Sequence, residues 1–187
     1  MNPYSELAKK AVETFIKEKI IISPPLDLPK EFLEKKAGIF VSIHKEKSLR
    51  GCIGTYLPTK INIAEEIIHN AISAATEDCR FEPIKKEELT SLTYTVYILS
   101  LPELVKDLKE LNPKKYGVIV KTFPLAFPNE EVIFNGHQVS KTGLLLPDLE
   151  GVETVEKQIS IACQKGEIDP TREKIFIYKF VVEKYED

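Results

Sequence analysis

One short run of the sequence brings together a thiol, a guanidinium and two glycines. It covers residues 49–54 and reads LRGCIG. The thiolate is the nucleophilic form of cysteine, and a neighbouring cation favours it. Cys52 is therefore a candidate nucleophile or acid/base group, and Arg50 a candidate thiolate stabiliser or anion binder. Gly51 and Gly54 suit a strand whose backbone bends or is approached closely, so they are candidate residues of a cleft.

A β-hairpin is predicted to carry this run. Strand-like residues 39–45 lead into a short polar turn, and residues 49–56 follow as a second strand. If the turn is centred between positions 46 and 47, Cys52 lies opposite Val41. Side chains alternate along a strand, so Arg50 and Cys52 share one face of the hairpin.

A purely structural interpretation of the same residues stays open. Cys52 would then be a small buried hydrophobic residue, and the glycines would mark a β-bulge. The residue types alone do not separate this interpretation from a functional one.

Two further segments carry polar residues that suit a site. Residues 78–83, DCRFEP, follow a predicted helix and form a loop, because a proline disfavours helix at the preceding position. Their charges would hold a loop over a cleft or bind a polar ligand, or Asp78 and Arg80 would pair and cap the helix end. Lys165 stands in the run CQKG at a helix C-terminus, where the helix dipole alone favours a cation.

Metal and cofactor sites are not predicted. His44, His69 and His137 show no ligand spacing with one another or with cysteine, and no phosphate-binding or dinucleotide-binding glycine motif occurs. Cys52 and Cys163 lie far from each other and from the third cysteine, Cys79, whereas structural zinc usually takes ligands in close pairs. We expect no bound zinc or iron and no cofactor.

Composition limits the function classes. The formal net charge is −3 and the pI about 5.8, which disfavours a dedicated nucleic-acid binder. The sequence has no apolar run long enough for a membrane span and no secretory signal at its start, and its odd cysteine number disfavours a disulfide framework. A cytoplasmic protein with reduced thiols is expected. Abundant Lys, Glu and Ile with no Trp fit a hyperthermophile, although an AT-rich coding bias gives the same picture.

Strand pairs and helices alternate without a regular βαβ period, which predicts an α+β fold with mostly antiparallel strands. At 187 residues the chain suits one domain, or one domain with a smaller lobe. An irregular connection is expected over residues 26–36. Helices are predicted near residues 3–16, 61–77 and 152–164, and strands at 39–45, 49–56, 92–100, 116–121, 131–134, 137–139, 143–146 and 174–182.

The motifs resemble the signature segments of the AMMECR family, whose bacterial and archaeal members are also called AmmeMemoRadiSam system protein A. The run LRGCIG resembles the family signature, and Asp78, Arg80, Phe81 and Pro83 resemble its Asp-x-Arg-Phe-x-Pro motif. Further matching segments follow in order over nearly the whole chain. The departures are Cys79 and Glu82 where prolines are common, Asp148 where Gln is usual, and Gly166-Glu167 where Ala-Gly is usual.

The resemblance implies two related halves that share a curved, barrel-like antiparallel sheet flanked by helices, with a larger and a smaller lobe. The family motifs would line a cleft, to which Gly51, Gly54, Asp78, Arg80, Phe81 and Lys165 would belong. The family has no settled activity. Its name implies a pathway shared with Memo-like and radical-SAM proteins.

The hypothesis that follows is an enzyme or catalytic accessory subunit acting on a small molecule or a modified macromolecule through Cys52 and Arg50. The alternative is a non-catalytic adaptor or regulatory module whose cleft binds a protein or peptide. A homodimer is compatible with either, and neither involves a membrane.

Overall fold

The computed structural model describes residues 2–125 and 140–186. The hairpin predicted over residues 131–139 lies outside the described residues. The chain divides into two compact units. Unit 1 contains Met1–Leu101 and Glu183–Asp187, and unit 2 contains Pro102–Val182.

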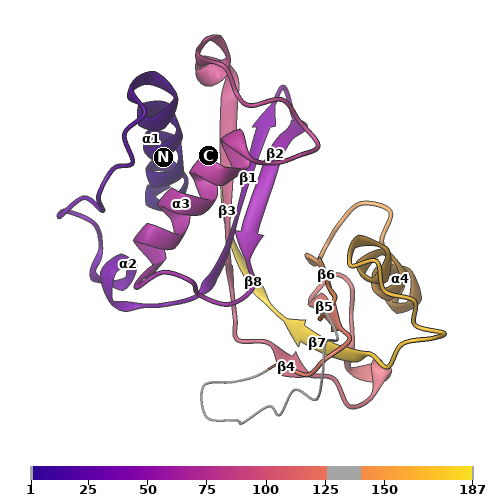
Figure 1. The fold of residues 1–187 in the computed structure, drawn as a ribbon. Coiled ribbons are helices and arrows are strands. Elements are labelled where there is room, and N and C mark those ends of the chain that lie inside the picture. The colour runs from indigo at the N-terminus through magenta and orange to yellow at the C-terminus, as the bar shows by residue number, and fades with distance from the viewer. Residues whose placement is uncertain (1, 126–139, 187) are drawn as a thin grey trace. The chain divides into compact units, whose positions relative to one another are not determined.

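Unit 1 is built on a four-stranded sheet in the order β2-β1-β3-β8 (Figure 1). β1 pairs antiparallel with β2 on one side and with β3 on the other. The strands are β1 (Gly38–Lys45), β2 (Ser48–Thr55), β3 (Leu92–Leu99) and β8 (Val182–Glu186).

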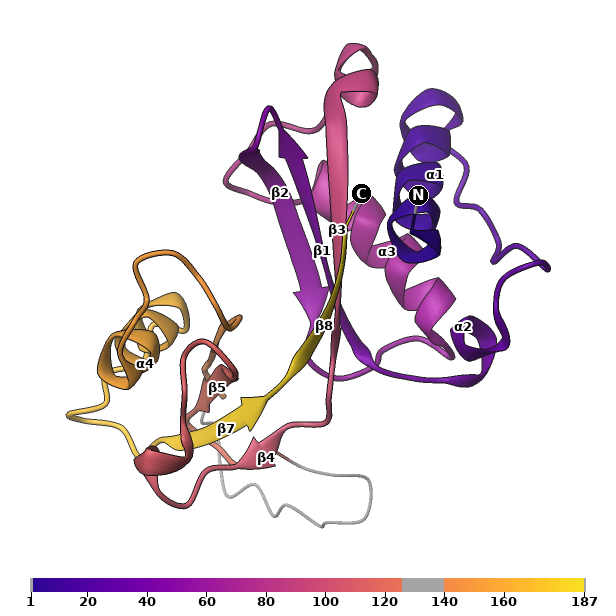
Figure 2. The ribbon, with the colours of Figure 1, turned by 180° about the vertical axis from the view of Figure 1, so that it is seen from behind.

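Helices cover one face of this sheet, as the view from behind shows (Figure 2). α1 (Pro3–Glu18) begins where the Asn2 side chain accepts a hydrogen bond from the Tyr4 N–H, 3.0 Å away. α3 (Ile63–Thr76) begins in the same way, with Asn62 accepting from the Glu65 N–H at 2.9 Å. The helical turn α2 (Lys30–Glu34) and the 3₁₀ turn η1 (Lys86–Ser91) complete the unit.

The core of unit 1 lies between the sheet and the helices. Alternate residues of β1, Ile39, Val41 and Ile43, are fully buried there. Burying a side chain of this size contributes about 1.5 to 3 kcal/mol, so this face is the main source of the unit's stability. The intervening residues of β1 therefore point to the opposite face of the sheet.

A β-bulge shifts the hairpin register by one residue. The turn lies at Glu46 and Lys47, as predicted, both with positive φ, and leads to the pairing of His44 with Leu49. Arg50 then has no partner in the register, and Cys52 pairs with Ser42. The predicted pairing of Cys52 with Val41, and with it that of Arg50 with Ile43, was wrong, because residue spacing alone does not reveal the extra residue of a bulge.

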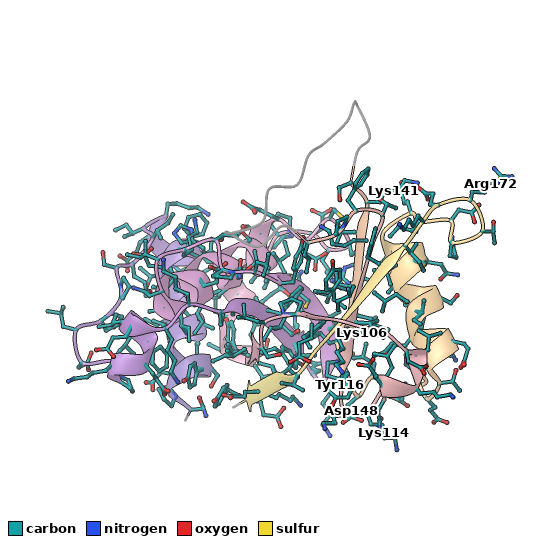
Figure 3. All side chains as sticks on the ribbon, turned by 90° about the horizontal axis from the view of Figure 1, so that it is seen from below. Lys106, Lys114, Tyr116, Lys141, Asp148 and Arg172 are labelled. Atoms are coloured by element: carbon teal, nitrogen blue, oxygen red, sulfur yellow. The ribbon has the colours of Figure 1, made fainter. Side chains whose placement is uncertain are left out.

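Unit 2 contains a second four-stranded sheet in the order β4-β7-β5-β6, also antiparallel. The helix α4 (Val155–Lys165) packs on β5 and β6, and a 3₁₀ turn η2 (Leu108–Glu110) follows β4. Figure 3 shows Lys114, Tyr116 and Asp148 gathered in one part of this unit. The strands are β4 (Glu103–Leu104), β5 (Gly117–Lys121), β6 (Thr142–Leu145) and β7 (Phe176–Phe180).

The predicted α+β class with mostly antiparallel strands is confirmed. The described strands form two separate sheets and not one closed barrel. The single strand predicted over residues 174–182 was wrong: β7 ends at Phe180 and β8 begins at Val182 in the other sheet. The run reads as continuous strand because both halves are β-like, and a change of sheet leaves no mark on the alternation. None of the described helices is long and apolar enough to cross a membrane.

Candidate functional site

Cys52 lies on the sheet face of unit 1 that points away from the helices. Its register partner Ser42 occupies the same face, and the Ser42 Oγ donates a hydrogen bond to the Cys52 Sγ at 3.1 Å. Cys52 is partly exposed, whereas Ser42 is only 4% exposed. A donor aimed at the sulfur favours the thiolate over the thiol, so this contact is chemically relevant.

The backbone at Cys52 is held on the outer edge of the sheet by the Asp78–Arg80 ion pair. The Cys52 N–H donates to the Asp78 Oδ2 at 2.8 Å, and the Arg80 Nη2 donates to the Cys52 carbonyl oxygen at 3.4 Å. Arg80 and Asp78 are joined by an ion pair of 2.6 Å. Because β2 is an edge strand, the pair satisfies backbone groups that another strand would otherwise bind.

The electrostatics of this pair follow from its geometry. The hydrogen bonds from Arg80 lower the pKa of the nearly buried Asp78 to about 2, and the Cys52 N–H adds to the effect. The same contact raises the pKa of Arg80. The Arg80 guanidinium also lies over the Phe81 ring, 5.3 Å from its centre. Cys52, Asp78, Arg80 and Phe81, which were predicted to belong together, are therefore neighbours.

Arg50 makes a different set of contacts. Its Nε and Nη2 donate to the Glu88 carboxylate at 3.1 and 3.0 Å, and its Nη1 donates to the Glu82 carbonyl oxygen at 2.7 Å. The Arg50 hydrogen bonds lower the pKa of Glu88 to about 2. These contacts hold the segment before β3 against β2. The guanidinium that donates to the Cys52 carbonyl oxygen is that of Arg80, and the thiolate-stabilising role of Arg50 stays a prediction.

The two glycines of the run have packing roles. A Cβ at Gly51 would collide with the carbonyl oxygen of Ala74 in α3, and a Cβ at Gly54 would collide with the Phe40 ring. Two observations therefore support the structural interpretation of the glycines. Other atoms approach both glycines closely, and a β-bulge lies at the neighbouring Arg50.

The row of polar side chains beside Cys52 could not be identified from residue types alone. Thr95 on β3 pairs with Ser42 in the register and is only 6% exposed. The pKa of Tyr97, also on β3, is raised chiefly by burial. Lys184 on β8 lowers it in part and Cys52 raises it, so the Tyr97 hydroxyl interacts electrostatically with both side chains. Polar residues alternate along β3 at Thr93, Thr95 and Tyr97, which predicts that they share one face of the sheet. Which face this is could be assigned only from the sheet register.

A pocket of about 540 Å³ opens on this polar face, entirely within unit 1. His44 lines it, and burial together with Lys184 lowers the pKa of that imidazole. Other lining residues are Lys47, Thr93, Thr95, Tyr97, Lys184 and Glu186.

Comparison with known proteins places the chain in a family. The model of the AMMECR1 family matches residues 5–185. The chain belongs to the AMMECR1 family. A Thermotoga maritima protein is 45% identical over 185 residues, which are 98% of this chain and 97% of that one. A crystal structure of an uncharacterized Pyrococcus horikoshii protein has a TM-score of 0.82 and 30% identity, and covers 100% of this chain and 93% of that chain.

The AMMECR1 domain also occurs within a longer chain. A Clostridium acetobutylicum protein is 41% identical over 187 residues, which are all of this chain but only 36% of that protein. Both Thermotoga maritima and Pyrococcus horikoshii are thermophiles, in agreement with the composition of this member.

Three further residues from the sequence analysis can be described within their own units. Lys165 ends α4 in unit 2 and is exposed. Cys163, also in α4, is 3% exposed, and burial raises its pKa. Cys79 is exposed on the turn between Asp78 and Arg80. Among residues 2–125 and 140–186, no group of three or more His, Cys, Asp or Glu side chains is arranged to bind a metal ion.

Proposed function

We propose that unit 1 carries the active site of an enzyme or catalytic accessory subunit, with Cys52 as its nucleophile. The substrate would be a small molecule or a modified macromolecule. The observation that carries this proposal is the hydrogen bond from the Ser42 hydroxyl to the Cys52 sulfur. A buried hydroxyl aimed at a partly exposed thiol is an arrangement that packing alone does not require.

The surroundings of Cys52 support a preorganised site. The Asp78–Arg80 ion pair binds both the N–H and the carbonyl group of Cys52, which restricts motion of the backbone that carries the sulfur. A nucleophile held in one position loses less entropy on reaching the transition state. Arg50 contributes indirectly, because its contacts with the Glu82 carbonyl oxygen and with Glu88 hold the segment that follows this ion pair.

The chemistry would be attack by the thiolate on an electrophilic carbon. The thiol proton leaves to water, a sulfur–carbon bond forms, and the leaving group departs with the electron pair of the bond that breaks. The Ser42 hydroxyl stabilises the negative charge on the sulfur before attack.

The Ser42 contact provides the test. Ser42→Ala is expected to slow alkylation of Cys52 by iodoacetamide at neutral pH by about three- to ten-fold, the effect of losing one typical hydrogen bond. Ser91→Ala is the matched control, because the Ser91 hydroxyl donates to the Glu88 carbonyl oxygen and not to sulfur. Peptide mass spectrometry gives the rate at each cysteine. Equal rates in the wild type and Ser42→Ala would contradict the nucleophile role.

A second candidate function is a non-catalytic adaptor or regulatory module that binds a protein or peptide. The longer Clostridium acetobutylicum relative favours it, because an AMMECR1 domain within a longer chain has covalent neighbours to contact. An association with Memo-like and radical-SAM proteins, and a homodimer, belong with this candidate as predictions. An adaptor does not need a reactive thiol, so the alkylation rate of Cys52 separates the two candidates.

A further inference from the structure

The pocket on the polar face of unit 1 lies beside Cys52 on the same side of the sheet. Ser42 pairs with Cys52 on β2 and with Thr95 on β3, so the three residues form one row across the strands. Thr95 lines the pocket. The pocket therefore begins where the row from Cys52 ends.

Hydrogen-bond donors predominate on the pocket wall. Lys47 and Lys184 bring ammonium groups, and the side chains of Thr93, Thr95 and Tyr97 bring hydroxyls. A wall of this kind, with two ammonium groups among hydroxyl donors, suits a carboxylate or phosphate.

The carboxylates of the pocket wall only weakly neutralise its ammonium groups. Lys184 pairs with Glu186 at 2.6 Å, and the two side chains are 50% and 58% exposed. An ion pair this exposed contributes about 0 to 1 kcal/mol, so an incoming anion replaces Glu186 at little cost. Glu46 also lines the pocket and is exposed at the tip of the hairpin, where solvent and salt screen its charge.

The spacing of the strands sets the distance between Cys52 and the pocket residues Thr95 and Lys184. Adjacent strands lie about 4.8 Å apart, so the row from Cys52 on β2 to Thr95 on β3 spans about 10 Å. β8, which carries Lys184, is the next strand. Adding one more interval places it about 14 Å from the strand of Cys52.

We propose that this pocket binds an anionic group of the substrate whose electrophilic carbon is attacked by Cys52. The substrate is thus an elongated organic anion, with its carboxylate or phosphate about 10 to 14 Å from the reacting carbon. This inference rests on the proposed function and adds the substrate class and its length.

Tethered alkylating agents test both the charge and the length. The probes are N-iodoacetyl derivatives of glycine, aminohexanoic acid and aminooctanoic acid, each compared with its neutral carboxamide. Cys79 is the internal control, because it is exposed and gives the general preference of the protein for each probe. The measured quantity is the rate for the acid divided by the rate for the amide, at each cysteine.

At Cys52 the ratio is expected to be about three- to five-fold higher for the two long acids than for the glycine derivative, the size of one exposed ion pair. Lys184→Met is expected to abolish this increase, and Glu186→Gln to enlarge it. A phosphonate of the same length distinguishes a phosphate site from a carboxylate site. A ratio that is independent of length, or unchanged in Lys184→Met, overturns the proposal.

Failure of the proposed function would look different. Cys52 would then react no faster than Cys79 with any probe, acidic or neutral. The pocket is still tested in that case by the N-acetyl analogue of the aminooctanoate, which cannot alkylate. NMR shifts at Thr95 and Lys184 on titration support an anion site if Lys184→Met removes them, and their absence in the wild type overturns it.

Discussion

The two units use the same device to pack a sheet against a helix. In unit 1, Gly51 of β2 lies against the carbonyl oxygen of Ala74 in α3. In unit 2, Gly143 of β6 lies against the carbonyl oxygen of Ala162 in α4. In each case a strand residue without a side chain allows the helix backbone to come close.

The units differ on the other side of the sheet. On that side of unit 2, the central strand β5 presents the fully buried Ile119 and the buried Lys121, whose Nζ donates to the Thr142 Oγ1 at 3.1 Å. The corresponding face of the unit 1 sheet, which points away from the helices, carries the buried Ser42 and Thr95 and the partly exposed Cys52. Two buried hydroxyls are costly unless they are bonded, whereas aliphatic residues are not. The comparison therefore separates a packing feature common to both units from a polar face present in unit 1.

The largest expected effect concerns the shared device. Gly51→Ala and Gly143→Ala should each lower the free energy of unfolding by about 3 kcal/mol, because the new methyl group collides with a backbone carbonyl. Urea unfolding followed by circular dichroism, with hydrogen exchange to locate the loosened unit, measures this. Gly151→Ala is the control: nothing lies within 4 Å of its Cβ position, and only its φ of 74° opposes the change. If all three variants lose the same stability, close approach is not the reason for the two glycines.

The ion pairs of the two units give the next contrast. Asp78→Ala leaves the Cys52 N–H without its acceptor and should lower stability by about 2 kcal/mol. Lys141→Ala in unit 2 removes the ion pair with Glu173, whose side chains are 39% and 28% exposed, and should cost less than about 1 kcal/mol. Similar losses for the two variants would show that Asp78 holds only a surface charge pair.

Lowering the pH should destabilise unit 1 through the carboxylates of Asp78 and Glu88. Hydrogen bonds lower the pKa of Asp78 from 3.8, and that of Glu88 from 4.5, to about 2. A lowered pKa means that the folded state binds the proton more weakly than the unfolded state. The stabilisation is therefore complete above about pH 5 and is lost as the pH falls from about 4.5 through 2, on the order of 2 kcal/mol for each group.

Hydrogen exchange of β2 peptides at pH 6, 4 and 3 measures this loss. The double variant Asp78→Asn and Glu88→Gln, less stable at pH 6, should show a flatter dependence on pH. If the wild type and the double variant respond equally to acid, other groups are responsible.

Local sequence signals predicted most of the elements, and the family resemblance implied the neighbours of Cys52. The helices predicted near residues 3–16 and 61–77 and the strand predicted at 39–45 were all confirmed. Asp78 and Arg80 were predicted near Cys52 and are. The elements were predictable because periodicity and turn signals act over a few residues.

The failures needed information from distant parts of the chain. The bulge at Arg50 made Ser42, and not Val41, the register partner of Cys52, and α3 approaches the neighbouring Gly51 from a distant part of the chain. Tyr97 and Lys184 join the site only through the pairing of four strands. Such contacts leave no local pattern in a single sequence.

The most direct test of the account compares the three thiols in one experiment. Exposure ranks Cys79 above Cys52, and Cys52 above the buried Cys163. The account predicts that Cys52 is alkylated by iodoacetamide faster than Cys79 at neutral pH, despite its lower exposure, and that Cys163 reacts only in the unfolded chain. Rates that follow exposure, with Cys79 first, would contradict the claim that the polar face of unit 1 activates Cys52.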